Sequence, residues 1–383
     1  MKKYFILAAA ALVTLASCVK NDIDQTSQKG REINFNAVAG LATKAAIDDV
    51  YFPNDAGSFG VYAAYLADGN NWDTNYASSS LYMGTSADAG QEVHYVSGNK
   101  IWEPTSKYYW PLQGTLTFFA YYPYEGLTTP AYTQGTQSFS IGSFTVDTTP
   151  ANQIDVLVSD FAKNKTGNES TYNDGTTTST LTGVSIVFKH MLSKIVFTAA
   201  ADANVYDSGL SFKINGITLG ARKTSASMSV TPGAAPVWAD PTALQAFTVN
   251  NTAFPNALTT NDAANWLNKA QSAQIGSAML MIPNSDFLGV DNTDNNKAAA
   301  DNDDEYVTVS YTLYRMSDGL NMGSKTIKFW LNDNQGTVDN WEAGKKYTYQ
   351  LTIGLEEIRF APQVTDWVPE AQTADVPGNG IAQ

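Results

Sequence analysis

Residues 33–40 read Ile33-Asn34-Phe35-Asn36-Ala37-Val38-Ala39-Gly40, and this stretch decides the class of fold. Ile33, Phe35, Ala37 and Ala39 recur at every second residue, which is the period of a strand that buries one face. Similar short runs rich in Tyr, Phe, Trp, Thr and Val follow, separated by clusters of Gly, Asn, Asp and Ser. Many short strands joined by polar turns are typical of antiparallel β-sandwiches. The sequence therefore predicts an all-β protein.

The expected strands fall into two series on either side of residues 164–183, a stretch made almost wholly of Thr, Ser, Gly, Asn and Asp. The runs that fit are 58–65, 92–95, 108–111, 116–123 and 154–158, then 184–188, 193–197, 212–217, 278–283, 306–311, 326–331 and 346–353. This pattern predicts an N-terminal sandwich over 45–183 and a C-terminal sandwich over 184–383, with a helix within 241–270, around residues 262–267. A long hairpin loop is the alternative interpretation of 164–183.

The chain begins with two lysines, an apolar run over 4–15 and small residues that end at its only cysteine, Cys18. These features predict a signal peptide over 1–17, too short to span a membrane. Leu15-Ala16-Ser17 followed by Cys18 resembles the lipobox of bacterial lipoproteins, which implies acylation of Cys18 and anchoring in the outer membrane. An ordinary signal peptide with an incidental cysteine is the alternative. Residues 18–44 are then expected to form a polar tether followed by the first strand.

Composition limits the partners and the source of stability. The 383 residues suffice for two domains, and the formal charge of −14 argues against nucleic acid or an anionic membrane surface as a partner. With one cysteine the chain can form no internal disulfide. Stability is therefore expected to come from the packing of sheets.

The sequence offers no assembled chemistry. Its two histidines, His94 and His190, cannot make a usual zinc site with one cysteine, and His190 fits a hydrogen-bonded core position. There is no phosphate loop and no nucleophile elbow, and the acidic run over 291–305 lacks EF-hand spacing. A carboxylate pair for glycoside cleavage stays open, because no spacing singles one out. We expect no catalytic residue, no metal and no cofactor, and hence a protein that is not an enzyme.

Aromatic residues concentrate between 102 and 124. They are Trp102, Tyr108, Tyr109, Trp110, Phe118, Phe119, Tyr121, Tyr122 and Tyr124. A period of two would bury about half of them in a sheet. The alternative is an exposed platform, which would make the protein a surface lipoprotein that binds glycans without polymerising.

Several motifs together resemble those of fimbrillin-like pilins of the Bacteroidales. They are Cys18 in its lipobox, the strand that ends at Thr43-Lys44-Ala45, Phe59-Gly60-Val61-Tyr62, Tyr108-Tyr109-Trp110-Pro111, the run 116–123, the run 188–195, Met281-Ile282-Pro283, the run 341–349 and Asp366-Trp367. The similarity extends over almost the whole chain. It implies two tandem transthyretin-like sandwich domains, lipid-assisted export to the cell surface and assembly into fimbriae with other subunits.

The resemblance also implies maturation by a trypsin-like protease that removes the first strand, so that a strand of the next subunit fills the vacant groove. Mapped onto this sequence, the cut falls between Lys44 and Ala45. Removal of a strand with this alternation would expose pockets and unpaired backbone groups, which bind another strand strongly. No receptor, whether a glycan or a protein, can be named from the sequence.

A candidate donor strand lies near the other end of the chain. Ile358 and Phe360 alternate as residues that fill pockets do, and Val364 and Trp367 follow. Pro362 would require a bulge or a sheet edge. An ordinary last strand of the second sandwich is the equal alternative.

Overall fold

The computed structural model describes most of the chain between Glu32 and Trp367. The residues described are 32–38, 42–43, 46–47, 57–85, 89–97, 101–168, 172–173, 178–179, 183–249, 267, 269, 273–283, 306–330, 340–355 and 358–367. Strands dominate them, which confirms the all-β prediction. The helices are short, and within the described residues none has the length and apolar character to cross a bilayer.

One end of the molecule is a sheet of nine strands that closes on itself, because β8 pairs with both β11 and β4. The closed path runs through β4 (Phe59–Leu66), β8 (Thr115–Tyr122), β11 (Leu157–Ser159), β15 (Val184–His190), β1 (Phe35–Val38), β7 (Ile101–Pro104) and β6 (Gln91–Val96). Two further strands, β5 (Ser80–Met83) and β12 (Ala162–Lys165), flank this path, which we call the ring. The short helices α1 (Trp72–Asn75) and η2 (Tyr76–Ser78) lie between β4 and β5.

The ring encloses an apolar core. Alternate residues of β4 and β8, such as Phe59, Val61 and Phe118, belong to the core inside the ring. The residues between them, such as Tyr62 and Phe119, belong instead to a second core that continues into the rest of the molecule. Both faces of these strands are buried, so their burial is nearly continuous along the sequence.

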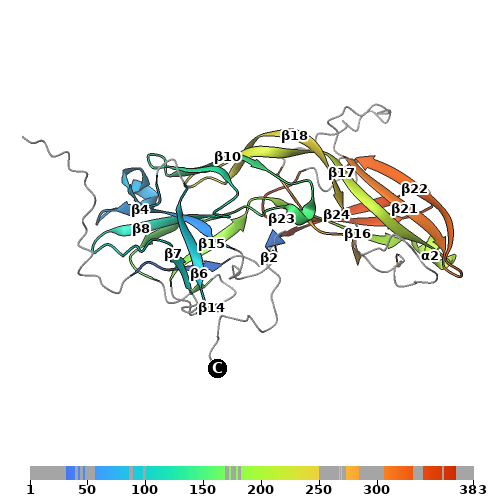
Figure 1. The fold of residues 1–383 in the computed structure, drawn as a ribbon, viewed down its shortest axis with the longest axis horizontal. Coiled ribbons are helices and arrows are strands. Elements are labelled where there is room, and N and C mark those ends of the chain that lie inside the picture. Colours follow the sequence, from blue (N-terminus) through green and yellow to red (C-terminus); the bar gives the residue numbers. More distant parts are fainter. Residues whose placement is uncertain are drawn as a thin grey trace, which may run out of the picture.

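A second sheet connects the ring to the other end of the molecule (Figure 1). Its strands are β9 (Thr128–Thr133), β10 (Ser138–Thr145), β17 (Leu210–Val230), β18 (Val237–Val249), β21 (Tyr306–Arg315) and β22 (Leu320–Trp330). One part of β17 pairs with β21 and a later part pairs with β10 beside the ring. This long strand therefore ties the two ends together. β18 occupies 241–249, and the helix expected around 262–267 lies almost wholly outside the described residues, so it stays a prediction.

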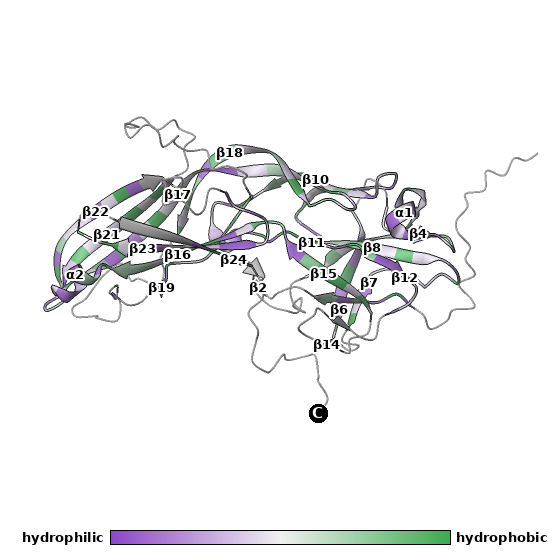
Figure 2. Ribbon diagram, turned by 180° about the vertical axis from the view of Figure 1, so that it is seen from behind, coloured by the Kyte–Doolittle hydropathy of each residue, from purple (hydrophilic) through white to green (hydrophobic). Residues whose placement is uncertain are grey.

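A third sheet covers the second one at the far end. It contains β16 (Ser193–Ala201), β19 (Ala273–Gln274), β20 (Met279–Met281), β23 (Lys345–Ile353) and β24 (Ile358–Asp366). Buried residues alternate with partly exposed ones along β21 and β23. Hydrophobic and hydrophilic positions are interspersed along the strands at this end of the molecule (Figure 2). Their apolar faces share one core. The helix α2 (Ala203–Asp207) leads from β16 to β17, and η3 (Pro150–Asn152) precedes β11.

Two small ribbons complete the described structure. They are β2 (Ala42–Thr43) with β3 (Ala46–Ile47), and β13 (Tyr172–Asn173) with β14 (Thr178–Ser179).

Two strand pairs depart from the purely antiparallel pairing that the sequence predicts. β1 is parallel to β15, and β16 is parallel to β23, while the other pairs described are antiparallel.

The expected domain boundary after residue 183 falls just before β15, yet β15 pairs with β11 and β1 of the ring. The division into two domains stays a prediction, and the pairing groups β15 with the strands that precede it.

Candidate functional site

The first strand occupies an internal place in the ring, between β15 and β7. Phe35, Asn36, Ala37 and Val38 face Val184, Ser185, Ile186 and Val187 in parallel register. On the other side Phe35 pairs with Trp102 of β7 in antiparallel register. We call this place the β1 seam. Loss of β1 would leave β15 and β7 with unpaired backbone groups on either side of a gap.

The apolar side chains of this strand are buried as the sequence predicts, and Asn36 between them is buried as well. Ile33, Phe35 and Ala37 are all buried, with exposed fractions of 1%, 0% and 3%. The ring of Phe35 lies 5.4 Å from that of Phe118 and 6.4 Å from that of Phe59, both edge to face. Phe35 therefore fills the centre of the ring's core, while Ala39 lies outside the described residues.

Polar contacts hold the start of this strand. Asn168 Oδ1 accepts hydrogen bonds from the backbone N–H of Asn34 (3.3 Å) and from Trp110 Nε1 (3.0 Å). Asn168 Nδ2 donates to the carbonyl oxygen of Glu32 (2.9 Å). The Glu32 carboxylate pairs with Lys107 at 2.6 Å, and this hydrogen bond raises the pKa of Lys107 above its ordinary value. One asparagine side chain thus ties the strand to the loop that carries Trp110.

Close backbone approach at the seam depends on Gly183. A Cβ atom there would lie 2.7 Å from the carbonyl carbon of Phe35, which is nearer than Cβ contacts allow. The φ angle of Gly183 is also positive, at +129°. A side chain at residue 183 would therefore push β1 away from β15.

The predicted processing and lipidation residues are not described. Cys18, Lys44 and Ala45 lie outside the described residues. The dipeptides on either side of the predicted cut, β2 and β3, pair with each other, Thr43 with Ala46 and Ala42 with Ile47. Within the described structure this ribbon pairs with no other strand.

The candidate donor residues lie on and after β24, in the sheet outside the ring (Figure 1). β24 is an edge strand that pairs with β23 along its whole length, from Ile358↔Ile353 to Asp366↔Lys345. Val364 is 45% exposed. Trp367 is buried and stacks on His190 with 3.6 Å between ring centroids. Within this chain the strand β24 thus pairs with β23 and not with the strands of the β1 seam.

His190 is a buried core residue, as the sequence predicts. Its Nδ1 lies 2.9 Å from Asp155 Oδ2, and both side chains are buried. Trp367 covers the imidazole ring, and the described residues contain no cluster of His, Cys, Asp or Glu that could hold a metal. The acidic run 291–305 lies outside the described residues. This pair therefore supports the packing of the last strand.

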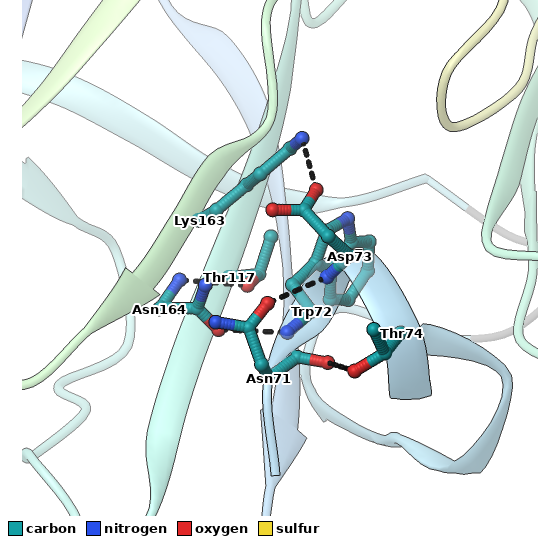
Figure 3. A network of polar contacts seen from close by, with 7 residues as sticks. All are labelled: Asn71, Trp72, Asp73, Thr74, Thr117, Lys163 and Asn164. Carbon is teal, nitrogen blue, oxygen red and sulfur yellow. Dashed lines mark hydrogen bonds and ion pairs between the residues drawn. The ribbon is translucent and has the colours of Figure 1, made fainter.

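A second polar network joins α1 to β12 (Figure 3). Asn164 Oδ1 accepts from the backbone N–H of Trp72 (2.9 Å), and the backbone N–H of Asn164 donates to Thr117 Oγ1 (3.1 Å). Lys163 Nζ pairs with Asp73 Oδ1 at 2.5 Å. These bonds fix β12 against β8 and α1. The polar side chains of this network therefore stabilise the fold.

The aromatic concentration between 102 and 124 is mostly interior. Trp102, Trp110, Phe118, Phe119 and Tyr121 are buried, with exposed fractions of 4% or less. The remaining four, Tyr108, Tyr109, Tyr122 and Tyr124, are partly buried. An aromatic platform open to solvent is therefore not formed by these residues.

Two residues of the seam were not predicted from the sequence, and only one of them carries a signal there. Asn168 lies in the polar stretch 164–183, where nothing distinguishes it from its neighbours. Gly183 does carry one, because an isolated glycine directly before an apolar run favours close backbone approach.

Comparison with known proteins places the chain in a family. Residues 63–367 match the model of the fimbrillin-like family. A search of curated proteins finds no match. Among solved structures, a fimbrial protein from Bacteroides vulgatus has a TM-score of 0.57 and 19% identity, covering 88% of this chain and 100% of that one.

Two proteins from Porphyromonas gingivalis are more distant. The tip fimbrial protein Mfa3 has a TM-score of 0.41 at 9% identity, covering 88% of this chain and 100% of that one. A fimbrilin (fimA) has a TM-score of 0.41 at 13% identity, covering 89% of this chain and 98% of that one. The family model covers well over half of the sequence, so the chain belongs to the fimbrillin-like family.

Proposed function

We propose that the chain is a structural subunit of a surface fimbria that polymerises by β-strand exchange and serves cell adhesion. The observation that carries this proposal is the internal place of β1 in a closed ring. The first described strand, β1, completes the ring, and a single cut on its C-terminal side would separate it from the rest of the chain. Membership in the fimbrillin-like family supports the same role.

Removal of β1 would leave a site that favours another strand. The places of Ile33 and Phe35 would become apolar cavities, and burial of one such side chain stabilises by about 1.5–3 kcal/mol. Backbone groups of β15 and β7 would lose partners at the same time, and unpaired strand edges bind extended chains. The vacancy would therefore be filled best by a strand with alternating apolar residues.

Export and maturation complete the proposal. The leader over 1–17 directs export, acylation of Cys18 anchors the precursor in the outer membrane, and a trypsin-like protease cuts after Lys44. The mature subunit then begins at Ala45 and joins other subunits at the cell surface. Two tandem transthyretin-like domains, the architecture of the resemblance, belong to this proposal. The interior position of most aromatics between 102 and 124 gives the glycan-binding alternative no support.

Limited trypsin digestion of a chain that starts at residue 19 tests the mechanism. A cut after Lys44 followed by SDS-resistant ladders is the expected result. The matched control is Lys44→Ala, which still offers trypsin Arg31 upstream of β1. A cut at Arg31 alone leaves β1 attached, so this variant should stay monomeric. A wild-type chain that loses residues 19–44 and stays monomeric contradicts strand exchange.

The N-terminal residue of protein sheared from cells tests processing in its own setting. Ala45 is expected in filament fractions. A filament subunit that still begins at Cys18 would contradict maturation at Lys44.

A further inference from the structure

The side chain of Asn168 continues the ladder of backbone hydrogen bonds along β1. In a parallel pair, every second residue donates through its N–H to the neighbouring strand and accepts at its carbonyl oxygen from a residue two positions further along that strand. The Asn34 carbonyl oxygen accepts from the Val184 N–H at 2.7 Å. The Asn34 N–H donates to Asn168 Oδ1 at 3.3 Å, where a longer β15 would offer a backbone carbonyl. A side-chain oxygen therefore takes the place of a backbone oxygen.

The nitrogen of the same amide completes this pattern. Asn168 Nδ2 donates to the carbonyl oxygen of Glu32 at 2.9 Å. Glu32 and Asn34 are two positions apart, so their backbone groups point to the same side of the strand. Asn168 thus supplies one donor and one acceptor to this side, as one residue of a paired strand does.

Trp110 fixes the orientation of the amide. Its indole Nε1–H can only donate, and it lies 3.0 Å from Asn168 Oδ1. A reversed amide would turn its own N–H groups toward this donor and toward the Asn34 N–H. The oxygen must therefore face both donors, which leaves Nδ2 for Glu32. Since Trp110 is buried in the core of the ring, the amide is held in the orientation that a strand backbone requires.

The amide lies where the ladder between β1 and β15 begins. β15 starts at Val184. On the opposite side of the seam, the Ile33 N–H donates to the carbonyl oxygen of Tyr108 at 2.8 Å. Within the described structure, Asn168 supplies partners on the β15 side before the bond to Val184. It therefore pairs the end of the strand where fraying would start.

We propose that Asn168 is a backbone clamp, which holds β1 of its own chain in the precursor and then the strand of another subunit in the polymer. This inference rests on the proposed strand exchange and adds a residue that binds the incoming strand. Both bonds end on backbone groups, Asn34 N–H and Glu32 O, and neither involves a side chain of β1. A strand of different sequence would therefore keep both bonds, provided that the residue at the place of Asn34 is not proline.

Hydrogen exchange tests the clamp in the uncut chain from residue 19. Asn168→Ala should speed exchange of the Asn34 amide about tenfold relative to the amides of β8, because two hydrogen bonds to the strand are lost. The matched control is Asn164→Ala, which breaks the network between α1 and β12 and leaves the seam intact. Its ratio of rates should equal that of the wild-type chain. An unchanged ratio in the Asn168 variant would overturn the clamp in the precursor.

Subunit dissociation tests the clamp in the polymer. After trypsin treatment, wild-type and Asn168→Ala chains should both assemble, and labelled subunits should leave preformed polymers about tenfold faster in the variant. Asn164→Ala should dissociate at the wild-type rate. Equal rates for wild type and Asn168→Ala would mean that the clamp does not hold the incoming strand, while strand exchange stands. A wild-type chain that is cut after Lys44 and does not polymerise contradicts the proposed function and this inference with it.

Asn168→Asp gives a measurement that a change in packing alone would not affect. An ionised aspartate keeps the acceptor oxygens but cannot donate to the strand, whereas a protonated one donates through its O–H. The ratio of its dissociation rate to the wild-type rate should therefore fall from about tenfold at pH 7 to about one below about pH 4, the ordinary range of an aspartate pKa. A ratio that stays constant over this range would show that residue 168 does not donate to the incoming strand, and the clamp would be wrong.

Discussion

The ring of Phe35 meets the ring of Phe118 edge to face, with 5.4 Å between centroids and 82° between planes. Phe118 lies in β8, which pairs with β4 and closes the ring, whereas Phe35 lies in β1. The contact thus crosses the interior of the ring and couples the strand proposed to be removed to the strand that closes the sheet. Edge-to-face aromatic pairs stabilise beyond the area that they bury.

Substitution of Phe35 by alanine should destabilise the uncleaved chain strongly. A fully buried phenylalanine replaced by alanine costs about 3–5 kcal/mol, from lost burial and from the cavity left behind. Chemical denaturation of the chain from residue 19 measures the change. Leu112→Ala is the control, because Leu112 is 54% exposed and should change the free energy of unfolding by less than about 0.5 kcal/mol. Equal effects of the two substitutions would show that Phe35 does not support the ring.

Gly183→Ala should destabilise the chain more than Gly69→Ala. Both glycines have positive φ angles, so both variants acquire backbone strain. Only at residue 183 would the new methyl group collide with backbone, whereas nothing lies within 4 Å of a Cβ at residue 69. We expect an excess of about 1–3 kcal/mol in urea denaturation. Equal free energies of unfolding would mean that β1 moves aside without cost.

Trp367→Ala should loosen the last strand. Trp367 is 5% exposed and its ring lies at 10° to that of His190. Its backbone N–H donates to Gly344 O at 2.8 Å, a bond that alanine can also make. Loss of this side chain should cost about 3–5 kcal/mol and speed hydrogen exchange in 358–366. Val364→Ala on the same segment is the control, since that side chain is largely exposed. Unchanged exchange rates in the Trp367 variant would show that the stack does not hold β24.

Local patterns in the sequence predict the parts of the seam that depend on local physics. The expected burial of Ile33, Phe35 and Ala37 is confirmed, because side chains at every second residue of a strand point to the same face. The core position of His190 is confirmed for the same reason. Such a strand can be recognised from its own residues, without knowing which strands it pairs with. The burial of Asn36 on the other face depends on neighbouring strands and was not predicted.

The partners of that strand could not be predicted in the same way. Phe35 pairs with Val184, far along the chain, and the pairing is parallel. Nothing in either stretch predicts that the two strands pair, since strands pair through backbone hydrogen bonds, which do not depend on the identity of the side chains. The ring closure through β4 and β8 and the hydrogen bonds of Asn168 depend on the same distant pairing. The sequence patterns predict a sandwich at this end of the molecule, whereas the long-range pairing of β1 with β15 belongs to a closed ring of strands.

Alkaline pH should destabilise the fold through its buried tyrosines. Burial, with a smaller contribution from the Asp155 charge, raises the pKa of Tyr122 to about 12, and burial also raises the pKa values of Tyr121 and Tyr132. An unfolded tyrosine titrates near pH 10, so between about pH 10 and 12 the unfolded chain releases protons that the folded chain retains. The stabilising contribution is therefore complete below pH 10 and is lost as the pH rises through 12.

Tyr122→Phe isolates one of these groups, because it keeps the ring and removes the ionisable hydroxyl. The free energy of unfolding of this variant should fall less steeply above pH 10 than that of the wild-type chain. The two curves should diverge by roughly 1–2 kcal/mol at pH 12, a figure reduced for the partial exposure of Tyr122. Below pH 9 neither residue carries charge, so the two curves should run parallel there, and urea denaturation across the pH range measures both. Parallel curves up to pH 12 would mean that Tyr122 ionises without strain in the folded ring.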